Sequence, residues 1–276
     1  MRIVITGSAG QLGRALQTVL QGEELLLLDL PQHDLTDYAA TQHTISGFQP
    51  HTVIHAAAFT NVDQCELQPE TAYKGNALAT QNVALACRTC KAAMVYISTD
   101  YVFDGAKGEP YWEWDHPNPQ SVYARSKLAG EYVTQSVLHR FYVVRTAWLY
   151  GRGAKNFVTS VLRLASERDQ LQYVTDEVGS PTYAPDLAKA LSKLIARPIY
   201  GIYHLTNAGV CSRYEWAKAI LELTGRPDYP ILRTQGYKRA AKVPARSELR
   251  NLAAATQFGI TMRPWREALA DYFHGD

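Results

Sequence analysis

Long apolar runs are missing from this sequence of 276 residues, and no stretch has the length needed to cross a bilayer. An excess of charge is missing too, because 28 Lys and Arg residues stand against 26 Asp and Glu residues, for a formal net charge of +2. This balance gives no reason to expect nucleic acid or a membrane surface as the main partner. Repeats and low-complexity tracts are also absent. We therefore expect a globular protein with one large domain and a smaller lobe.

Cysteine is scarce. Of the four cysteines, Cys87 and Cys90 have the spacing of half a zinc site or of a redox pair, but no second pair exists and no histidine lies close by in sequence. Their segment is typical of the apolar end of a helix, where a free cysteine is a small core residue. We predict no metal site from these residues. The segment Met1–Thr6 is already strand-like, so we expect no secretory signal and a cytoplasmic location.

The first half of the chain alternates apolar, β-rich runs with helical patterns, which predicts an α/β fold with a doubly wound parallel sheet of the Rossmann type. The expected strands are Arg2–Thr6, Glu24–Leu28, Thr52–His55, Ala92–Ser98 and Phe141–Thr146. The expected helices lie near Leu12–Leu20, Tyr38–Gly47, Glu70–Arg88 and Ser121–Leu138. Such sheets bind ligands beyond the carboxyl ends of their strands.

The pattern is less regular after about residue 150. Helices are expected near Asn156–Arg168, Pro185–Ala196, Arg213–Leu223 and Trp265–Phe273, with a further strand near Gly201–Leu205. We predict a dinucleotide-binding domain of residues 1–150 plus about 183–205. A smaller substrate lobe of about 151–182 plus 206–276 would close over the cofactor.

A glycine-rich turn, Gly7-Ser-Ala-Gly10-Gln-Leu-Gly13, stands where the first strand ends and the first helix begins. Glycines permit the tight turn and let the backbone approach a pyrophosphate, and the helix N-terminus adds free N–H donors. A glycine-rich turn without a ligand is the alternative interpretation. The strand-turn-helix context favours a dinucleotide cofactor.

Asp29 follows the second expected strand, where an acidic residue would accept hydrogen bonds from the adenosine ribose. A 2′-phosphate about 4 Å from that carboxylate would cost several kcal/mol at an effective dielectric near 20, which favours NADH. Arg14 or solvent could offset much of this cost, so NADPH stays open. Ala56, Ala57 and Ala58 after the third strand supply a wall without bulky side chains, whereas His55 before them is interpreted as a core residue.

Two segments carry the chemistry: Ser98-Thr-Asp-Tyr-Val-Phe-Asp-Gly105 and Tyr123-Ala-Arg-Ser-Lys127. A phenol and an ammonium one helical turn apart share a helix face, and the lysine charge is expected to lower the pKa of the phenol. Such a tyrosine can protonate a carbonyl oxygen while hydride reaches the carbon, so the chain is predicted to be a carbonyl reductase. Tyr214 and Lys218 have the same spacing but lie in a predicted amphipathic helix, and we assign them no catalytic role.

The glycine turn, Asp34-Leu35, Ala56-Ala-Ala-Phe-Thr60, Ser98-Thr-Asp-Tyr-Val-Phe103 and Tyr123-x-x-x-Lys127 resemble the extended short-chain dehydrogenases. More narrowly, the chain resembles the family of the dTDP-4-dehydrorhamnose reductases. Further matches are Arg145-Thr-Ala-Trp148-Leu-Tyr-Gly151, Asn156-Phe157 and Gly179-Ser-Pro-Thr182-Tyr-Ala, so the resemblance spans nearly the whole chain. It implies reduction of the C4 keto group of dTDP-4-dehydro-L-rhamnose to dTDP-L-rhamnose with NADPH or NADH.

The resemblance implies Tyr123 as the proton donor and Lys127 as the residue that holds the nicotinamide ribose and tunes Tyr123. Thr99 would bond the C4 oxygen of the sugar, and Asp100 and Trp148 would contact the sugar nucleotide. The implied cofactor residues are Gly7, Gly10, Gln11, Leu12 and Gly13 at the pyrophosphate, Asp29 at the ribose, Asp34 and Leu35 near the adenine, and Ala56, Ala57 and Ala58 on the inner side. The expected partner is a small sugar nucleotide. A homodimer and a divalent cation such as Mg²⁺ stay open.

Family members often carry Arg-Pro-x-x-Ser-x-Leu near the C-terminus, where this chain has Val243-Pro-Ala-Arg-Ser-Glu-Leu249. The arginine before the proline is missing. Lys238, Arg239, Lys242 and Arg246 either grip the diphosphate of the substrate or form a solvated basic loop, and the sequence favours neither.

Two other function classes share this scaffold. A sugar-nucleotide dehydratase typically has a glutamate directly after the Thr-Asp pair, where this chain has Tyr101, and an epimerase retains its dinucleotide. A non-catalytic cofactor-binding regulatory subunit would not need the intact Thr99, Tyr123 and Lys127.

Overall fold

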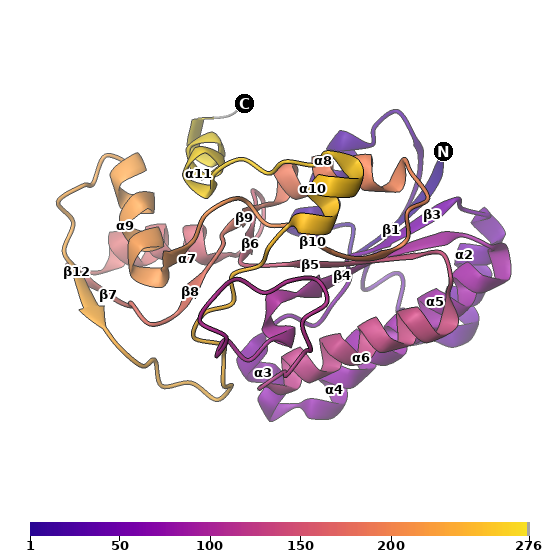
Figure 1. Cartoon of the computed structure of the whole chain (residues 1–276), viewed down its shortest axis with the longest axis horizontal. Helices are drawn as coiled ribbons and strands as arrows, with labels where there is room; N and C mark the ends of the chain where they lie inside the picture. The colour runs from indigo at the N-terminus through magenta and orange to yellow at the C-terminus, as the bar shows by residue number, and fades with distance from the viewer. Residues whose placement is uncertain (275–276) are drawn as a thin grey trace.

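The computed structural model describes residues 1–274. Its centre is a sheet of six parallel strands in the order β10-β5-β4-β3-β1-β2 (Figure 1). The strands are β1 (Arg2–Thr6), β2 (Glu24–Leu28), β3 (Thr52–His55), β4 (Ala93–Thr99), β5 (Phe141–Thr146) and β10 (Gly201–His204). Each expected strand is present, and the predicted doubly wound α/β fold is confirmed.

Apolar side chains from successive strand residues enter two different cores, because side chains alternate between the faces of a strand. Ile3 and Ile5 of β1 belong to one buried cluster, whereas Val4 between them belongs to another. Both faces are therefore dry, which explains why the strands are apolar throughout rather than alternating.

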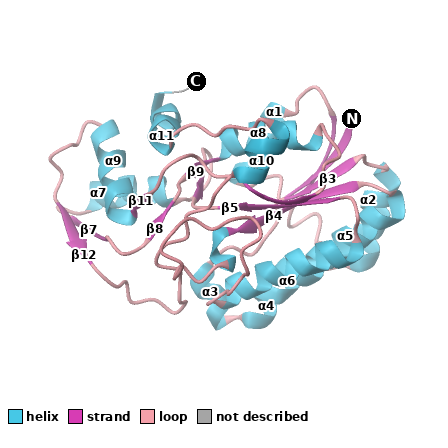
Figure 2. Ribbon diagram, viewed as in Figure 1, coloured by secondary structure: helices cyan, strands magenta, loops and turns pink. Residues whose placement is uncertain are grey.

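Helices cover both faces of the sheet (Figure 2). On one face lie α1 (Gln11–Val19), α8 (Ala184–Ile195) and α10 (Leu252–Phe258). On the other lie α2 (Tyr38–Phe48), α5 (Ala79–Cys90) and α6 (Val122–Val137), and the short helices α3 (Val62–Leu67) and α4 (Pro69–Tyr73) lie beside α6. The chain leaves β1 for β2 on one side and later returns to β3 on its other side, so the strand order reverses beside β1. A ligand site is expected beyond the carboxyl ends of the strands at that point.

A third apolar cluster lies beyond one end of the sheet and is rich in aromatic rings. It is built on α7 (Phe157–Glu167), α9 (Arg213–Leu223) and α11 (Trp265–His274), with Trp216 fully buried at its centre. Short strand pairs complete this part of the chain: β6 (Leu149–Tyr150) with β9 (Thr182–Tyr183), β7 (Leu171–Val174) with β12 (Ile231–Thr234), and β8 (Val178–Gly179) with β11 (Cys211–Ser212). The division into two domains at the predicted boundaries stays a prediction.

The predicted helix over residues 70–88 is interrupted. The chain forms α4, then a π-helical turn η1 (Lys74–Leu78), and then α5. Asn76 in the π turn is fully buried, and its amide exchanges hydrogen bonds with both backbone groups of Phe59 and donates to Ser126. Periodicity does not reveal such a turn, because it adds one residue without a change of polarity. Helices α3 and α10 and the short strands were not predicted either.

Within residues 1–274, no helix combines the length and the apolar content that a membrane span needs.

Candidate active site

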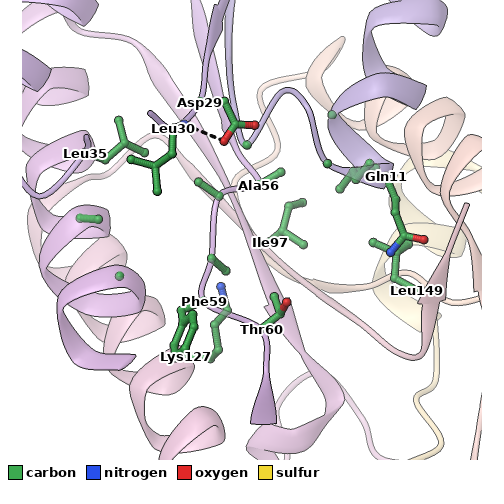
Figure 3. Close-up of a pocket in the computed structure, with 18 of the residues that line it drawn as sticks. Gln11, Asp29, Leu30, Leu35, Ala56, Phe59, Thr60, Ile97, Lys127 and Leu149 are labelled. Atoms are coloured by element: carbon green, nitrogen blue, oxygen red, sulfur yellow. Dashed lines mark hydrogen bonds between the residues drawn. The ribbon is translucent and has the colours of Figure 1, made fainter. Parts of the chain in front are cut away.

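A cavity of about 920 Å³ opens at the carboxyl ends of the central strands. In Figure 3, Asp29 and Lys127 lie at opposite ends of the cavity, and Gln11 and Leu149 line one side of it. The predicted cofactor residues all border this cavity, as do Thr99 and Trp148. Residues from the turn after β1 and from α6, more than one hundred positions apart, therefore line one cavity.

The glycine turn fits an anionic ligand. Gly7 has a positive φ of 66°, and a Cβ added there would lie 2.7 Å from the backbone nitrogen of Ala57. A Cβ on Gly13 would lie 2.3 Å from the carbonyl oxygen of Gly7. Gly10 is the N-cap residue of α1, and none of the described side chains caps this end of the helix. Backbone donors and the positive helix end therefore face the cavity, where a pyrophosphate would bind.

The side chain of Gln11, in the glycine turn, contacts the start of α7, one of the helices of the aromatic cluster. The amide of Asn156, the N-cap residue of α7, donates to Gln11 Oε1 at 3.0 Å. The part of the chain that contains α7 therefore contacts a residue of the cavity lining directly.

Asp29 is held by backbone groups at the end of β2. The N–H of Ala9 donates to Asp29 Oδ2 at 2.7 Å, and the N–H of Leu30 donates to Oδ1 at 2.8 Å (Figure 3). The carboxylate is therefore fixed between the glycine turn and β2, where it can accept bonds from a ribose. Asp34 instead bonds the backbone and the hydroxyl of Thr36, which hold the pKa of this carboxyl below its usual value.

Tyr123 and Lys127 stand one turn apart near the start of α6, where the hydroxyl of Ser121 caps the helix by accepting the N–H of Ala124 at 3.2 Å. Both side chains border the cavity. The ring of Tyr101 meets the ring of Tyr123 edge-on, with the centroids 6.1 Å apart. Tyr123 therefore presents its phenol to the same space as the glycine turn.

The sequence argument predicted that Lys127 lowers the pKa of Tyr123, and this prediction is wrong for the structure. Burial raises the pKa of the phenol, while a hydrogen bond with Thr99 opposes that rise. Burial also lowers the pKa of Lys127 to about 7, and the Glu131 carboxylate works in the opposite direction. Desolvation is the largest cause of both pKa shifts, and for Lys127 it outweighs the opposing charge of Glu131.

Asp100 is the one predicted site residue that does not border the cavity. It is buried in the 3₁₀ turn η2 (Asp100–Val102), where it accepts hydrogen bonds from the hydroxyls of Ser247 and, at 3.1 Å, of Thr99. Burial raises its pKa to about 6. Asp100 therefore links the C-terminal segment to Thr99, and its predicted contact with the sugar nucleotide stays a prediction.

Trp148 has an unusual backbone for a bulky residue, with φ at 45°. Its indole packs so closely on Gly179 that a Cβ there would lie 2.6 Å from Trp148 Cε2. The guanidinium of Arg213 covers the ring at 3.5 Å from its centroid. The Gly-Ser-Pro-Thr motif therefore has a physical reason, since only glycine leaves room for this indole beside the cavity.

Several residues at the site were missed by the sequence argument. Thr146 Oγ1 is buried without a hydrogen-bond partner among the described residues and borders the cavity. Arg145 beside it forms a buried ion pair with Glu131, 2.7 Å between Nη2 and Oε2. Both lie in the Arg145-Thr-Ala-Trp148 motif, which was noted for its resemblance without a role for these two. Other unpredicted lining residues include His33, Thr60, Lys74, Ala154 and Lys155.

The residues that were assigned no catalytic role lie outside the cavity lining. His55 is buried between the hydroxyls of Thr6 and Thr80, and burial lowers its pKa to about 3. Tyr214 and Lys218 lie on α9, away from the cavity lining. Cys87 is buried, and burial raises the pKa of its thiol well above the ordinary range.

The basic C-terminal residues are mostly paired. Arg239 lies 3.3 Å from Asp63, Lys242 donates to Gln120, and Arg246 pairs with Glu248 at 2.6 Å. Within residues 1–274, His, Cys, Asp and Glu side chains do not gather in threes that could hold a metal ion.

Comparisons with known proteins give one consistent result. The family model described as "RmlD substrate binding domain" matches residues 1–275. A crystal structure of a dTDP-4-dehydrorhamnose reductase from Clostridium acetobutylicum is 42% identical, with a TM-score of 0.96 over 99% of this chain and 98% of that one. A reductase of the same name from Bacillus anthracis, solved in complex with NADP, is 38% identical with a TM-score of 0.96 over the same shares. A curated dTDP-4-dehydrorhamnose reductase from Mycobacterium tuberculosis is 40% identical over 280 residues, which cover 98% of this chain and 91% of the relative.

Proposed function

Because the chain belongs to the RmlD substrate binding domain family, we propose that it reduces the C4 keto group of dTDP-4-dehydro-L-rhamnose with NADPH or NADH, yielding dTDP-L-rhamnose, the last step of dTDP-rhamnose biosynthesis. The observation that carries this proposal is the shared cavity. Its lining includes both the glycine turn at Gly7, where a dinucleotide would bind, and the side chains of Thr99, Tyr123 and Lys127. A binding module without chemistry would not need a phenol and an ammonium at that place.

The residues present fit a dinucleotide. The glycine turn and the first turn of α1 would hold the pyrophosphate, and Asp29 would meet the adenosine ribose. Asp34 and Leu35 line the cavity where the adenine would lie, and Ala56, Ala57 and Ala58 line it without bulky side chains. The nicotinamide supplies a hydride when the reduced cofactor is bound.

Tyr123 acts as the general acid. Burial keeps its phenol protonated at neutral pH, so a proton is available when negative charge develops on the C4 oxygen of the sugar. Thr99 exchanges a hydrogen bond with Tyr123 and can orient the same oxygen. Lys127, one turn further along α6 and in the lining of the same cavity, would hold the nicotinamide ribose.

The charge state of Lys127 links this chemistry to pH. Its pKa of about 7 means that the ammonium and the neutral amine coexist near neutrality. The Glu131 carboxylate opposes deprotonation, and Arg145 holds Glu131 in place. We therefore expect activity to fall as Lys127 loses its proton.

The substrate side of the site rests on Trp148 and on the C-terminal lobe, for which we propose residues 151–182 and 206–276. Asp100 would act near the sugar through Thr99 and Ser247. Our proposal also includes a cytoplasmic enzyme whose partner is this sugar nucleotide. A homodimer is a prediction that light scattering of the purified protein tests.

The decisive experiment is a spectrophotometric assay with enzymatically generated dTDP-4-dehydro-L-rhamnose, with loss of NADPH or NADH absorbance as the signal. NMR of the product identifies the configuration at C4. Formation of dTDP-L-rhamnose supports the proposal, while the C4 epimer would assign a sister reductase. Oxidised cofactor retained through purification, with no net consumption of NADPH or NADH, would favour an epimerase instead.

A further inference from the structure

Tyr96 lies in the middle of β4, fully buried beneath helix α6. The ammonium of Lys127 stands over its ring, with Nζ 4.2 Å from the ring centroid. This is the distance and placement of a cation–π interaction, in which the negative face of an aromatic ring attracts a positive charge. The interaction is stronger when both groups are removed from water, as they are here, since Lys127 is only 3% exposed.

The hydroxyl of Tyr96 reaches the same residue by a second route. It donates to the main-chain carbonyl oxygen of Lys127 at 3.0 Å. The approach depends on Gly130, because a Cβ at that position would lie 2.2 Å from Tyr96 Oη. A single side chain therefore contacts both the backbone and the charged end of Lys127.

We propose that Tyr96 is a positioning residue for Lys127, holding its backbone through the hydroxyl and its ammonium through the ring. This inference rests on the proposed function, in which Lys127 serves the reaction. Tyr96 does not border the cavity, so it acts on the reaction only through Lys127.

Other charged or titratable groups around Lys127 do not replace the ring. Among the described residues, Lys127 has no ion pair within 4 Å, although Glu131 on the next turn of α6 acts on it at longer range. That carboxylate is already engaged by Arg145. His55 on β3 stacks on Tyr96 at 5.9 Å and stays neutral, since burial and Lys127 both lower its pKa. Tyr123 on α6 is the remaining neighbour, and it keeps its proton at neutral pH.

Many buried tyrosines whose hydroxyl is hydrogen-bonded are ordinary core residues without a functional role. Tyr142 is an example in this protein. Tyr142 lies on the adjacent strand β5, is 2% exposed, and donates its hydroxyl to the carbonyl oxygen of Arg197 at 2.6 Å. None of the described cations stands over its ring within the distance seen at Tyr96. Tyr142 is therefore a matched control for burial, volume and hydroxyl bonding.

The test is an NMR titration of the protein labelled with ¹³C at lysine Cε, without substrate. Lys127→Arg identifies the Lys127 signal by its loss. We expect a midpoint near 7 in the unchanged protein and in Tyr96→Phe, which keeps the ring. In Tyr96→Leu the midpoint falls by about one pH unit, because the protonated form loses the attraction of the ring. Tyr142→Leu should leave the Lys127 midpoint unchanged.

A fluorinated ring separates attraction from packing if Tyr96→Leu fails to fold. With 3,4,5-trifluorophenylalanine at position 96, the shape is retained while the negative face of the ring is weakened, so the Lys127 midpoint should again fall. The same midpoint in this variant as in Tyr96→Phe would overturn the proposal, as would an equal fall in Tyr142→Leu.

Kinetics give the second readout. With saturating cofactor, kcat of Tyr96→Leu should fall about tenfold at pH 8 and its alkaline limb should move to lower pH, whereas Tyr96→Phe should stay within about threefold of the unchanged protein. The two proposals fail in different ways. A protein that consumes no cofactor with the keto sugar contradicts the proposed function, while the NMR titration still reports whether Tyr96 holds the charge of Lys127.

Discussion

Arg145 and Glu131 form a bidentate ion pair in the protein interior, with 2.9 Å between Nε and Oε1 and 2.7 Å between Nη2 and Oε2. Neither side chain is more than 2% exposed. Ser98 adds a hydrogen bond to Glu131 Oε1, and Arg145 also donates to the carbonyl oxygen of Glu113. The pair thus joins β5 to α6 one turn beyond Lys127, beside the end of β4.

Arg145→Met should destabilise the fold strongly, because Glu131 would keep a buried charge without its partner. We expect the free energy of unfolding to fall by about 3–5 kcal/mol, measured by urea denaturation at pH 7. Arg163→Met is the control, since Arg163 pairs with Glu167 at 2.6 Å on the surface, where both side chains are about half exposed. Its loss should cost less than about 1 kcal/mol. Equal losses in the two variants would show that burial of the pair is unimportant.

The central strands were predictable because their apolar runs are continuous and end at recognisable turns. The Glu131–Arg145 pair was not, because its members are 14 positions apart and meet only after α6 packs on the sheet. The π turn at Asn76 was hidden for a related reason. Its cause is a set of hydrogen bonds to Phe59 and Ser126, which are distant in sequence.

Asp100 should make stability depend on pH. Its pKa in the folded protein is about 6, above the ordinary 3.8, so the folded state holds the proton more tightly than the unfolded chain. This contribution is complete below pH 4 and is lost as the pH rises through 6. Compared with Asp100→Asn, the unchanged protein should lose about 2 kcal/mol of unfolding free energy between pH 4 and pH 7.

Urea titrations at several pH values measure this difference. Asp228→Asn, which removes an exposed carboxylate, is the control for the change of side chain. A flat difference for Asp100→Asn would mean that Asp100 ionises normally in its buried position.

Gly179→Ala should weaken binding of the sugar nucleotide. The new Cβ would meet the indole of Trp148 at 2.6 Å and push it from its place beside the cavity. We expect kcat/KM for the sugar nucleotide to fall by about tenfold or more, while the dissociation constant of NADPH, measured by fluorescence, stays unchanged. Gly22→Ala is the control, because its Cβ meets nothing within 4 Å. An unaltered kcat/KM in Gly179→Ala would show that Trp148 does not contribute to the substrate site.

Asp29→Asn should shift the cofactor preference toward NADPH. The amide can still accept one of the backbone bonds from Ala9 or Leu30, but the negative charge that repels a 2′-phosphate is gone. The ratio of kcat/KM with NADPH to that with NADH should rise about tenfold. Asp228→Asn is the control and should leave the ratio unchanged. An unchanged ratio in Asp29→Asn would show that this carboxylate does not lie at the adenosine ribose.

For the site, motifs predicted which residues gather, whereas the structure was needed for their electrostatics. The spacing of Tyr123 and Lys127 placed both on one helix face. It could not show that burial dominates both pKa values, since desolvation depends on Tyr96 and other residues that pack around them after folding. Likewise, the hydrogen bond between Asp100 and Ser247 joins positions 147 apart, and no local sequence pattern predicts it.

The central claim is that Tyr123 gives the proton to the keto oxygen, and Tyr123→Phe tests it most directly. With enzymatically generated dTDP-4-dehydro-L-rhamnose and saturating NADPH, kcat should fall by about 10²–10⁴-fold, while the dissociation constant of NADPH stays within about threefold. Turnover close to that of the unchanged protein, with cofactor still bound, would contradict the account.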